Sequence, residues 1–79
     1  MENGAMQDHH LIRMGNQIAT FFESFPDQQE ALRELALHLK RFWPPQMRRA
    51  LLSLLDTGQG EQAHRLLVSA VQMHRDLLE

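Results

Sequence analysis

Histidine has the clearest potential for chemistry in this 79-residue chain, because imidazole nitrogens bind transition metals and transfer protons. The chain has five histidines and no cysteine. His9 and His10 are neighbours, and His64 and His74 are ten residues apart, so the members of each pair would lie on different faces of a helix. No His-Glu-x-x-His motif accompanies them. We therefore expect no metal ion and no other cofactor on this chain.

Serine nucleophiles are no better supported. Ser24, Ser53 and Ser69 lack the flanking glycines of a nucleophile elbow. Gly58-Gln59-Gly60 is too short to cradle a phosphate group. A chain of this length also has little volume for a pocket and for the shell of residues that must support it. The sequence therefore predicts a protein that is not an enzyme.

The segment from His38 to Arg48 is the candidate for a binding function. It contains the only tryptophan of the chain, Trp43, which is followed by two prolines. Residues 35–55 carry four basic side chains and no acidic one, whereas the rest of the chain carries four basic and ten acidic side chains. Aromatic and arginine side chains with few acids are typical of the centres of protein–protein interfaces. We therefore predict a docking surface here that binds an anionic partner.

Several side chains of this segment are expected to face outwards. Trp43 would lie at a helix end beside prolines, where full burial is difficult, and is predicted to be the anchor of the surface. Lys40 and Arg41 complement the dipole at a helix C-terminus. Arg48 falls near a helix start, where positive charge is mildly unfavourable, and this position favours an anionic partner. His38 is interpreted as a half-buried helix residue, with an interface residue as the alternative.

The phenylalanines are divided between the interior and the surface. Phe21, Phe25 and Phe42 are predicted to fill the core, because large rings supply much of the interior of so short a chain. Phe22 is adjacent to Phe21 and diverges from it by about 100° around a helix. Both rings cannot face the same way, and Phe22 is assigned to the binding surface.

Hydrophobic periodicity predicts an all-α fold, a small bundle of about four short helices. Residues 1–7 are predicted to be a disordered tail and residues 8–79 a single helical domain. Leucines that recur at helical spacing are expected to form much of the core, among them Leu35, Leu39, Leu51 and Leu67.

Residues with special backbone preferences predict where the helices begin and end. Asp8 is the expected N-cap of the first helix, and Pro26 suits the first turn of the second. Trp43-Pro44-Pro45 should end the second helix and start the third at one of the prolines. Gly58 is the expected left-handed residue after the third helix. The fourth helix should run from about Glu61, with an apolar stripe that reaches Leu78.

Charge and composition limit the classes of partner. The net charge of −2 and the isoelectric point near 6.2 are unfavourable for a nucleic-acid binder, whose affinity depends on neutralising phosphates. No signal peptide is recognisable at the start of the chain, and no apolar run is long enough to span a bilayer. The absence of cysteine fits a reducing compartment, and we expect a cytoplasmic location.

Two sequence blocks together carry a family resemblance. The first, Leu11-Ile12-Arg13-Met14-Gly15-Asn16-Gln17-Ile18-Ala19-Thr20-Phe21-Phe22, is similar to L-[IV]-R-M-A-N-Q-I-A-x-F-F. The second, His38-Leu39-Lys40-Arg41-Phe42-Trp43-Pro44-Pro45-Gln46-Met47-Arg48, is similar to H-[IL]-x-x-F-W-x-P-R-M-R. Both patterns belong to the delta subunit of the cytosolic, NAD-dependent, molybdenum-containing formate dehydrogenases, which this chain resembles. Gly15 departs from the usual alanine, and a glycine weakens a helix unless something packs closely there.

The resemblance implies a non-catalytic accessory role. In that family the alpha subunit holds the molybdenum cofactor, other subunits hold flavin and further iron–sulfur clusters, and the delta subunit carries no redox cofactor. The resemblance implies that the delta subunit supports assembly, stability or cofactor maturation of the complex. The expected partner of this chain is accordingly the molybdenum-bearing alpha subunit, with no membrane and no nucleic acid involved.

The expected binding surface combines side chains of the first helix with those of the second junction. Its predicted members are Arg13, Asn16, Gln17, Phe22, His38, Lys40, Arg41, Trp43, Pro45, Met47 and Arg48. One alternative is a small nucleic-acid-binding or antitoxin-like module that uses the Lys40–Arg49 segment on phosphates. Another is a maturation factor that binds transiently. An aromatic patch without its partner is also prone to self-association, so the isolated chain could form a homodimer.

Overall fold

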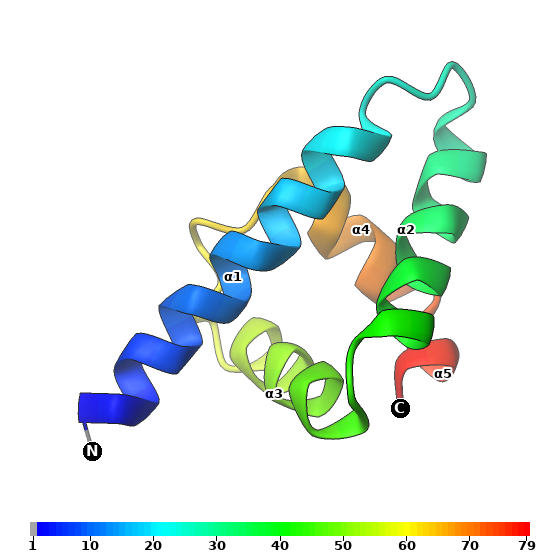
Figure 1. Ribbon diagram of the computed structural model, residues 1–79. Coiled ribbons are helices and arrows are strands. Elements are labelled where there is room, and N and C mark those ends of the chain that lie inside the picture. The colour runs from blue at the N-terminus through cyan, green and yellow to red at the C-terminus, as the bar shows by residue number, and fades with distance from the viewer. Residues whose placement is uncertain (1) are drawn as a thin grey trace.

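The chain folds into helices alone within residues 2–79, the residues that the computed structural model describes, with side chains described from His10 onwards. The helices are α1 (Glu2–Phe22), α2 (Gln28–Phe42), α3 (Pro45–Asp56), α4 (Arg65–Met73) and α5 (Arg75–Leu78), as Figure 1 shows. The predicted all-α class is therefore confirmed. None of the helices in this part of the chain combines the length and the apolar character that a membrane span requires.

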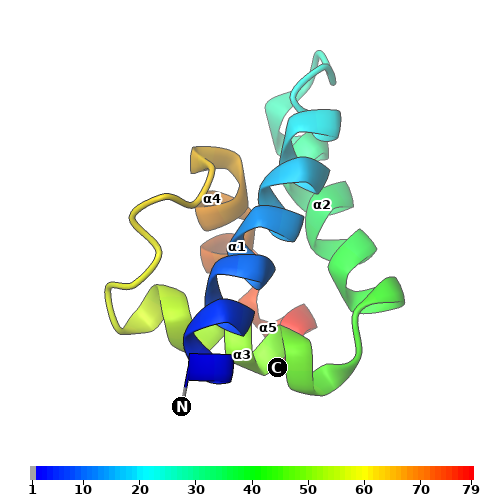
Figure 2. The ribbon, with the colours of Figure 1, turned by 60° about the vertical axis from the view of Figure 1, so that its left-hand side comes forward.

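The helices pack around α2. α1 and α2 run in opposite directions, α4 lies behind them in the view of Figure 1, and α3 closes the lower end (Figures 1 and 2). α2 contacts each of the other four helices, and α1 also contacts α3 and α4. Segments far apart in the sequence, such as α1 and α4, therefore meet across one core.

Capping and proline chemistry explain where α2 and α3 begin. Asp27 is the N-cap of α2, and its carboxylate accepts a hydrogen bond of 2.9 Å from the backbone N–H of Gln29. The helix consequently begins at Gln28, slightly later than the expected start at Pro26. α3 begins at Pro45, one of the two prolines predicted, because a proline in the first helical position loses no hydrogen bond.

Gly58 ends α3 in the predicted left-handed conformation, with a φ of 78°. The backbone N–H of Gln59 donates to the carbonyl of Leu54 at 2.9 Å, which satisfies a carbonyl that the helix end leaves without a partner. This is the hydrogen bond of a Schellman motif, and it turns the chain back towards α1.

α4 begins later and ends earlier than predicted. It starts at Arg65, not near Glu61, because the Nδ1 atom of His64 accepts a hydrogen bond of 3.0 Å from the backbone N–H of Leu66. His74, with φ of −121° and ψ of 37°, then separates α4 from α5. The single helix expected at the end of the chain is therefore two helices.

The start of α1 also differs from the prediction. α1 begins at Glu2, so the boundary expected at Asp8 lies within the helix. The proposed capping by Asp8 concerns a side chain outside the described ones. The division of the chain into a tail of residues 1–7 and a domain of residues 8–79 stays a prediction.

Leucines from all five described helices meet in one buried cluster. Leu35, Leu39, Leu51 and Leu67 are each at most 1% exposed, as their helical spacing predicted. Alanines of α1, α2 and α4 are completely buried between them, and small side chains of this kind let helix backbones approach closely. The core is consequently thin and is made mainly of aliphatic side chains.

α1 presents a different face to the core than the phenylalanine pattern predicted. Ile12, Ala19 and Phe22 are buried, whereas Phe21 is 66% exposed. Phe42, at the end of α2, is 68% exposed. The predictions that Phe21 and Phe42 fill the core and that Phe22 faces outwards are therefore wrong. α1 packs against three helices at once, and its small residues mark the buried face better than its large ones.

Gly15 allows the close contact between α1 and α4. A Cβ atom at this position would lie 2.7 Å from Cδ2 and 3.3 Å from Cδ1 of Leu67, which is fully buried. Both distances are shorter than an ordinary van der Waals contact. A glycine at this position weakens the helix unless something packs closely against it. Leu67 of the same chain is that close neighbour.

We predict that Gly15→Ala does not stabilise the protein, although alanine favours a helix over glycine by about 1 kcal/mol. Crowding against Leu67 should outweigh this gain and lower the free energy of unfolding by about 1 kcal/mol, as over-packing commonly does. In a Leu67→Val background, where both crowding atoms are absent, the same substitution should become stabilising. Urea denaturation of the four variants tests this, and an equal effect of Gly15→Ala in both backgrounds would contradict it.

Candidate partner-binding surface

The predicted binding residues divide into three groups by exposure. Arg13, Gln17, Lys40, Arg41 and Pro45 are exposed. Asn16, His38, Met47 and Arg48 are half-buried, and Phe22 and Trp43 are buried. These residues lie on α1, α2 and α3 and in the corner between α2 and α3. The three helices contact one another, so the two family-like blocks are neighbours in space.

Trp43 is not the exposed anchor that its position beside two prolines suggested. Its side chain is only 6% exposed and belongs to the core cluster. Trp43 is the C-cap residue of α2 in an extended conformation, and its backbone N–H donates to the carbonyl of Leu39 at 2.9 Å. The backbone before Pro44 is extended and the indole is buried in the core, so this corner is a structural joint.

Arg48 has an internal role that explains its position near a helix start. Its Nη1 atom donates a 2.7 Å hydrogen bond to the carbonyl of Lys40 in the last turn of α2. It therefore complements the negative end of α2 across the corner, although it belongs to α3. The Nε atom of Arg48 is buried and has no hydrogen-bond partner among the described residues. An external anion is therefore not needed to explain why Arg48 lies near the start of α3.

Lys40 is also partly engaged within the chain, through a weak 3.4 Å hydrogen bond from its Nζ to the carbonyl of Leu77. Arg13 and Arg41, by contrast, make no ion pair and no side-chain hydrogen bond with any residue whose side chain is described. Of these predicted cations, Arg13 and Arg41 are thus the ones directed to solvent.

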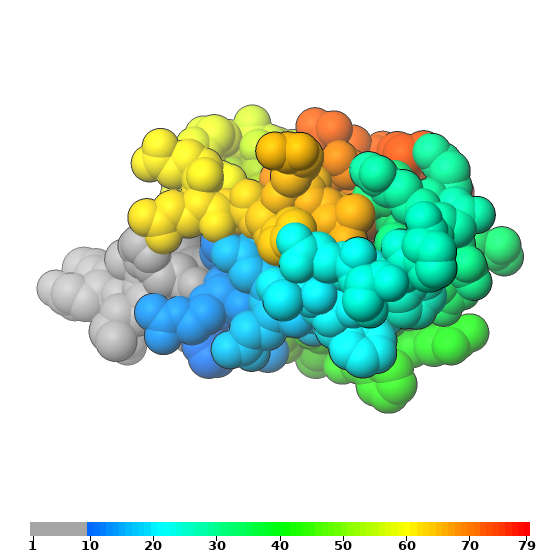
Figure 3. Space-filling model, turned by 90° about the horizontal axis from the view of Figure 1, so that it is seen from above, coloured from blue at the N-terminus to red at the C-terminus, as the bar shows by residue number. Residues whose placement is uncertain are grey.

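Asn16 holds the loop between α3 and α4 against α1. Its Nδ2 atom donates to the carbonyl of Gln62 at 2.9 Å, and its Oδ1 atom accepts from the backbone N–H of His64 at 2.7 Å. Figure 3 shows this loop, in yellow, against the blue part of α1. Both ends of the amide are used inside the chain, so the half-buried Asn16 is part of the fold and has little to offer a partner.

A row of aromatic rings connects α1 with α2 at the surface. Phe21 contacts Phe22 edge-to-face, with ring centroids 5.0 Å apart. Phe22 also meets Phe25 at 5.0 Å and His38 at 6.1 Å, and His38 lies 4.7 Å from Phe42. We call these five residues the aromatic row. It begins and ends in an exposed ring.

The exposed ends of the aromatic row were missed because both rings were assigned to the core. A signal was present in the sequence: Arg13, Gln17 and Phe21 are four residues apart, so they share one helix face. All three are exposed. On α2 the same spacing aligns His38 with Phe42. The exposed arginines and aromatic rings of the two blocks thus lie on an α1 stripe and at the end of α2.

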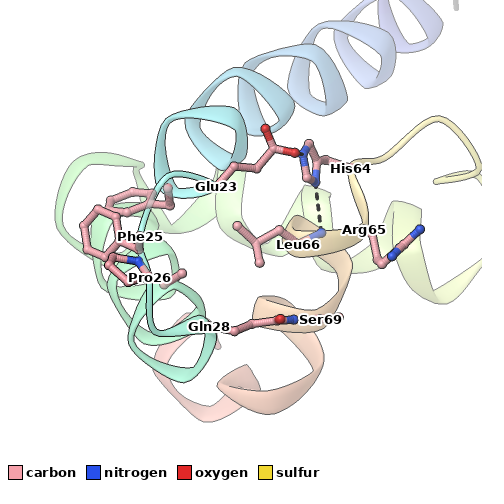
Figure 4. Close-up of a pocket in the computed structure, with 10 residues that line it drawn as sticks. Glu23, Phe25, Pro26, Gln28, His64, Arg65, Leu66 and Ser69 are labelled. Carbon is pink, nitrogen blue, oxygen red and sulfur yellow. Dashed lines mark hydrogen bonds and ion pairs between the residues drawn. The ribbon is translucent and has the colours of Figure 1, made fainter.

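A cleft of about 550 Å³ lies on another side of Phe22, between the α1–α2 turn and α4 (Figure 4). Its floor includes Ala31 and Leu66, and His64 and Glu23 meet at its edge with 2.7 Å between Nε2 and Oε2. Because Nδ1 of His64 accepts from a backbone N–H, Nε2 carries the proton that is donated to Glu23. Both nitrogens are therefore occupied, and this histidine has no free lone pair with which to act as a base.

Charged side chains elsewhere form structural pairs. The guanidinium of Arg75 donates to both carboxylate oxygens of Asp56, at 3.0 and 2.6 Å, and to Glu79 at 3.0 Å. The hydrogen bond from Arg75 lowers the pKa of Asp56, and these carboxylates raise the pKa of Arg75. The pair with Asp56 ties α5 to the end of α3. Among the residues with described side chains, no group of three metal-binding side chains converges.

We predict that Trp43→Ala destabilises the fold by about 3–5 kcal/mol, the usual cost of removing a large buried aromatic side chain. Phe42→Ala is the matched control, because it removes the neighbouring aromatic ring from a solvent-exposed position. It should change the free energy of unfolding by less than about 1 kcal/mol. Denaturant unfolding followed by circular dichroism measures both, and equal losses in the two variants would contradict the burial of Trp43.

We also predict that Asn16→Ala lowers the free energy of unfolding by about 1–3 kcal/mol, because it leaves two backbone groups of the loop without partners. Gln17→Ala, at the adjacent exposed position, should have an effect within about 0.5 kcal/mol of zero. Amide hydrogen exchange should additionally show faster exchange at His64 in the Asn16 variant. Unchanged exchange there would show that the amide does not hold the loop.

Comparison with known proteins adds an independent observation. The family model described as NADH-dependent formate dehydrogenase delta subunit FdsD matches residues 10–71. No match was found among curated proteins or among solved structures. The matched span contains both sequence blocks, the complete aromatic row and the Asn16 contact with the loop. The chain belongs to the NADH-dependent formate dehydrogenase delta subunit family.

Proposed function

We propose that this chain is a non-catalytic accessory subunit that binds the molybdenum-bearing alpha subunit of a cytoplasmic formate dehydrogenase and supports its assembly or stability. Membership of the delta subunit family implies that the chain is part of a formate dehydrogenase complex and that its partners are other subunits of that complex. The choice of the alpha subunit and the supporting role are our proposal.

The observation that carries the proposal is the position of the two family-like blocks. The first lies on α1, and the second runs from the end of α2 through the corner to the start of α3. α1 and α2 pack against each other through Phe22 and His38. Each block contributes an exposed aromatic ring and an exposed arginine: Arg41 directly precedes Phe42, and Arg13 lies on the α1 stripe that leads to Phe21. Large exposed apolar rings are costly to keep in water, and at such positions they commonly mark a surface that another protein covers.

The side chains with potential for chemistry support a role without catalysis. His64, the histidine at the edge of the cleft, has both ring nitrogens in structural hydrogen bonds. The bidentate pair of Arg75 with Asp56 holds two helices together at a solvent-exposed site. These groups are used to position elements of the fold, which is what an accessory subunit requires.

The nucleic-acid alternative loses support from the same geometry. Its basic segment, Lys40–Arg49, was attractive because four cations lie close together in sequence. Lys40 and Arg48 instead donate to backbone carbonyls of the chain itself. Fewer cations then remain for phosphates, whose neutralisation provides most non-specific affinity.

Removing the chain from a cell that makes the complex tests the proposal. We expect the amount of assembled complex to fall several-fold, while the turnover of formate per bound molybdenum in the remaining complex stays unchanged. The chain should also co-purify with the alpha subunit in constant stoichiometry, because a transient maturation factor would be absent from the mature complex. Normal assembly with a reduced turnover per molybdenum would overturn the proposal and assign the chain a role in the reaction.

A further inference from the structure

We infer that the aromatic row, together with Arg13 and Arg41, binds an acidic segment of the alpha subunit, whose carboxylates pair with the two arginines and whose apolar side chains cover Phe21 and Phe42. This inference rests on the proposed function, since it names the chemistry of the contact that the accessory subunit makes.

The two exposed rings are suited to act as rigid anchors. Phe21 rests edge-to-face on Phe22, at an interplanar angle of 85°, and Phe22 is only 7% exposed. Phe42 rests on the half-buried His38. Because each ring is supported by a more deeply buried ring, binding would cost little additional side-chain entropy. Aromatic rings in such positions are enriched among the residues that dominate binding energy.

The charges around these rings determine the kind of partner. No acidic residue occurs between Leu11 and Phe22, or between Leu35 and Leu55. Arg13 lies on the same exposed stripe of α1 as Phe21, and Arg41 directly precedes Phe42. Neither arginine has a partner among the residues with described side chains. Carboxylates on the other protein would satisfy both of them.

A protein segment fits this surface better than a phosphate backbone does. The row is apolar over most of its length, and Glu34 lies one turn before His38 on α2, half-buried at its edge. That carboxylate would repel the closely spaced phosphates of a nucleic acid. A peptide segment can place its carboxylates at the two arginines only and cover the rings with apolar side chains.

The physical roles of the two residue classes can be separated by kinetics. Exposed charges steer the encounter and mainly change the association rate and its dependence on salt, whereas buried anchors mainly change the dissociation rate. We expect Arg13→Glu/Arg41→Glu to slow association with the purified alpha subunit roughly tenfold at low salt and to remove most of its salt dependence. We expect Phe21→Ser/Phe42→Ser to accelerate dissociation by roughly tenfold or more.

Matched controls are available in the same chain. Arg33→Glu/Arg65→Glu changes the net charge by the same amount at two exposed arginines outside the row. Met73→Ser removes an apolar side chain at the end of α4. Met73 is 53% exposed in the intact protein. Both controls should bind as the unchanged chain does. Circular dichroism and denaturant unfolding of every variant establish that the fold is retained.

The outcomes distinguish this inference from the proposed function. If the unchanged chain binds the alpha subunit and the arginine and phenylalanine variants bind equally well, the surface is wrong while the accessory role stands. If the charge controls slow association as strongly as the arginine pair, the effect is one of net charge and the inference is also wrong. If the unchanged chain binds duplex DNA and not the alpha subunit, both are overturned.

Discussion

Trp43 is buried at the corner where α2 ends and α3 begins, and it links this corner to the core. The indole closes the corner between α2 and α3 and joins the cluster to which every helix contributes. Since Pro44 and Pro45 restrict the backbone on one side and Arg48 bonds to the last turn of α2 on the other, the angle of the corner is strongly constrained. In a chain of 79 residues, which has little apolar surface to bury, the loss of one such side chain removes a large part of the net stability.

A second constraint joins α1 to the C-terminal half of the chain. Gly15 gives Leu67 room to pack against the backbone of α1. The side-chain amide of Asn16 holds the loop between α3 and α4 through two hydrogen bonds. Both residues belong to the first family-like block. Their roles in the fold explain why Gly15 and Asn16 occur in this block. A residue can therefore belong to a family motif without being a binding residue.

Phe21 and Phe42 are exposed because the core of so short a chain has little space for further rings. The interior is filled by leucines, alanines and Trp43, and helices this close together leave little space for a ring in every apolar position. Phe21 and Phe42 are therefore outside the core while remaining attached to it through Phe22 and His38. A surface of this kind is stable in the isolated chain and is available for a partner, which is consistent with the accessory role proposed for a delta subunit.

The helical class, the leucine core, the left-handed Gly58 and the start of α3 at a proline could all be predicted from the sequence, because local backbone preferences and hydrophobic periodicity act within a few residues. The family patterns are also visible there. Which ring of each aromatic pair is buried could not be predicted: adjacent rings have similar hydrophobicity, and the choice depends on the helices that pack against them. The same holds for Arg48 and Asn16, whose partners lie on other elements. Local sequence cannot reveal such partners, since each hydrogen bond exists only once the separate helices have come together.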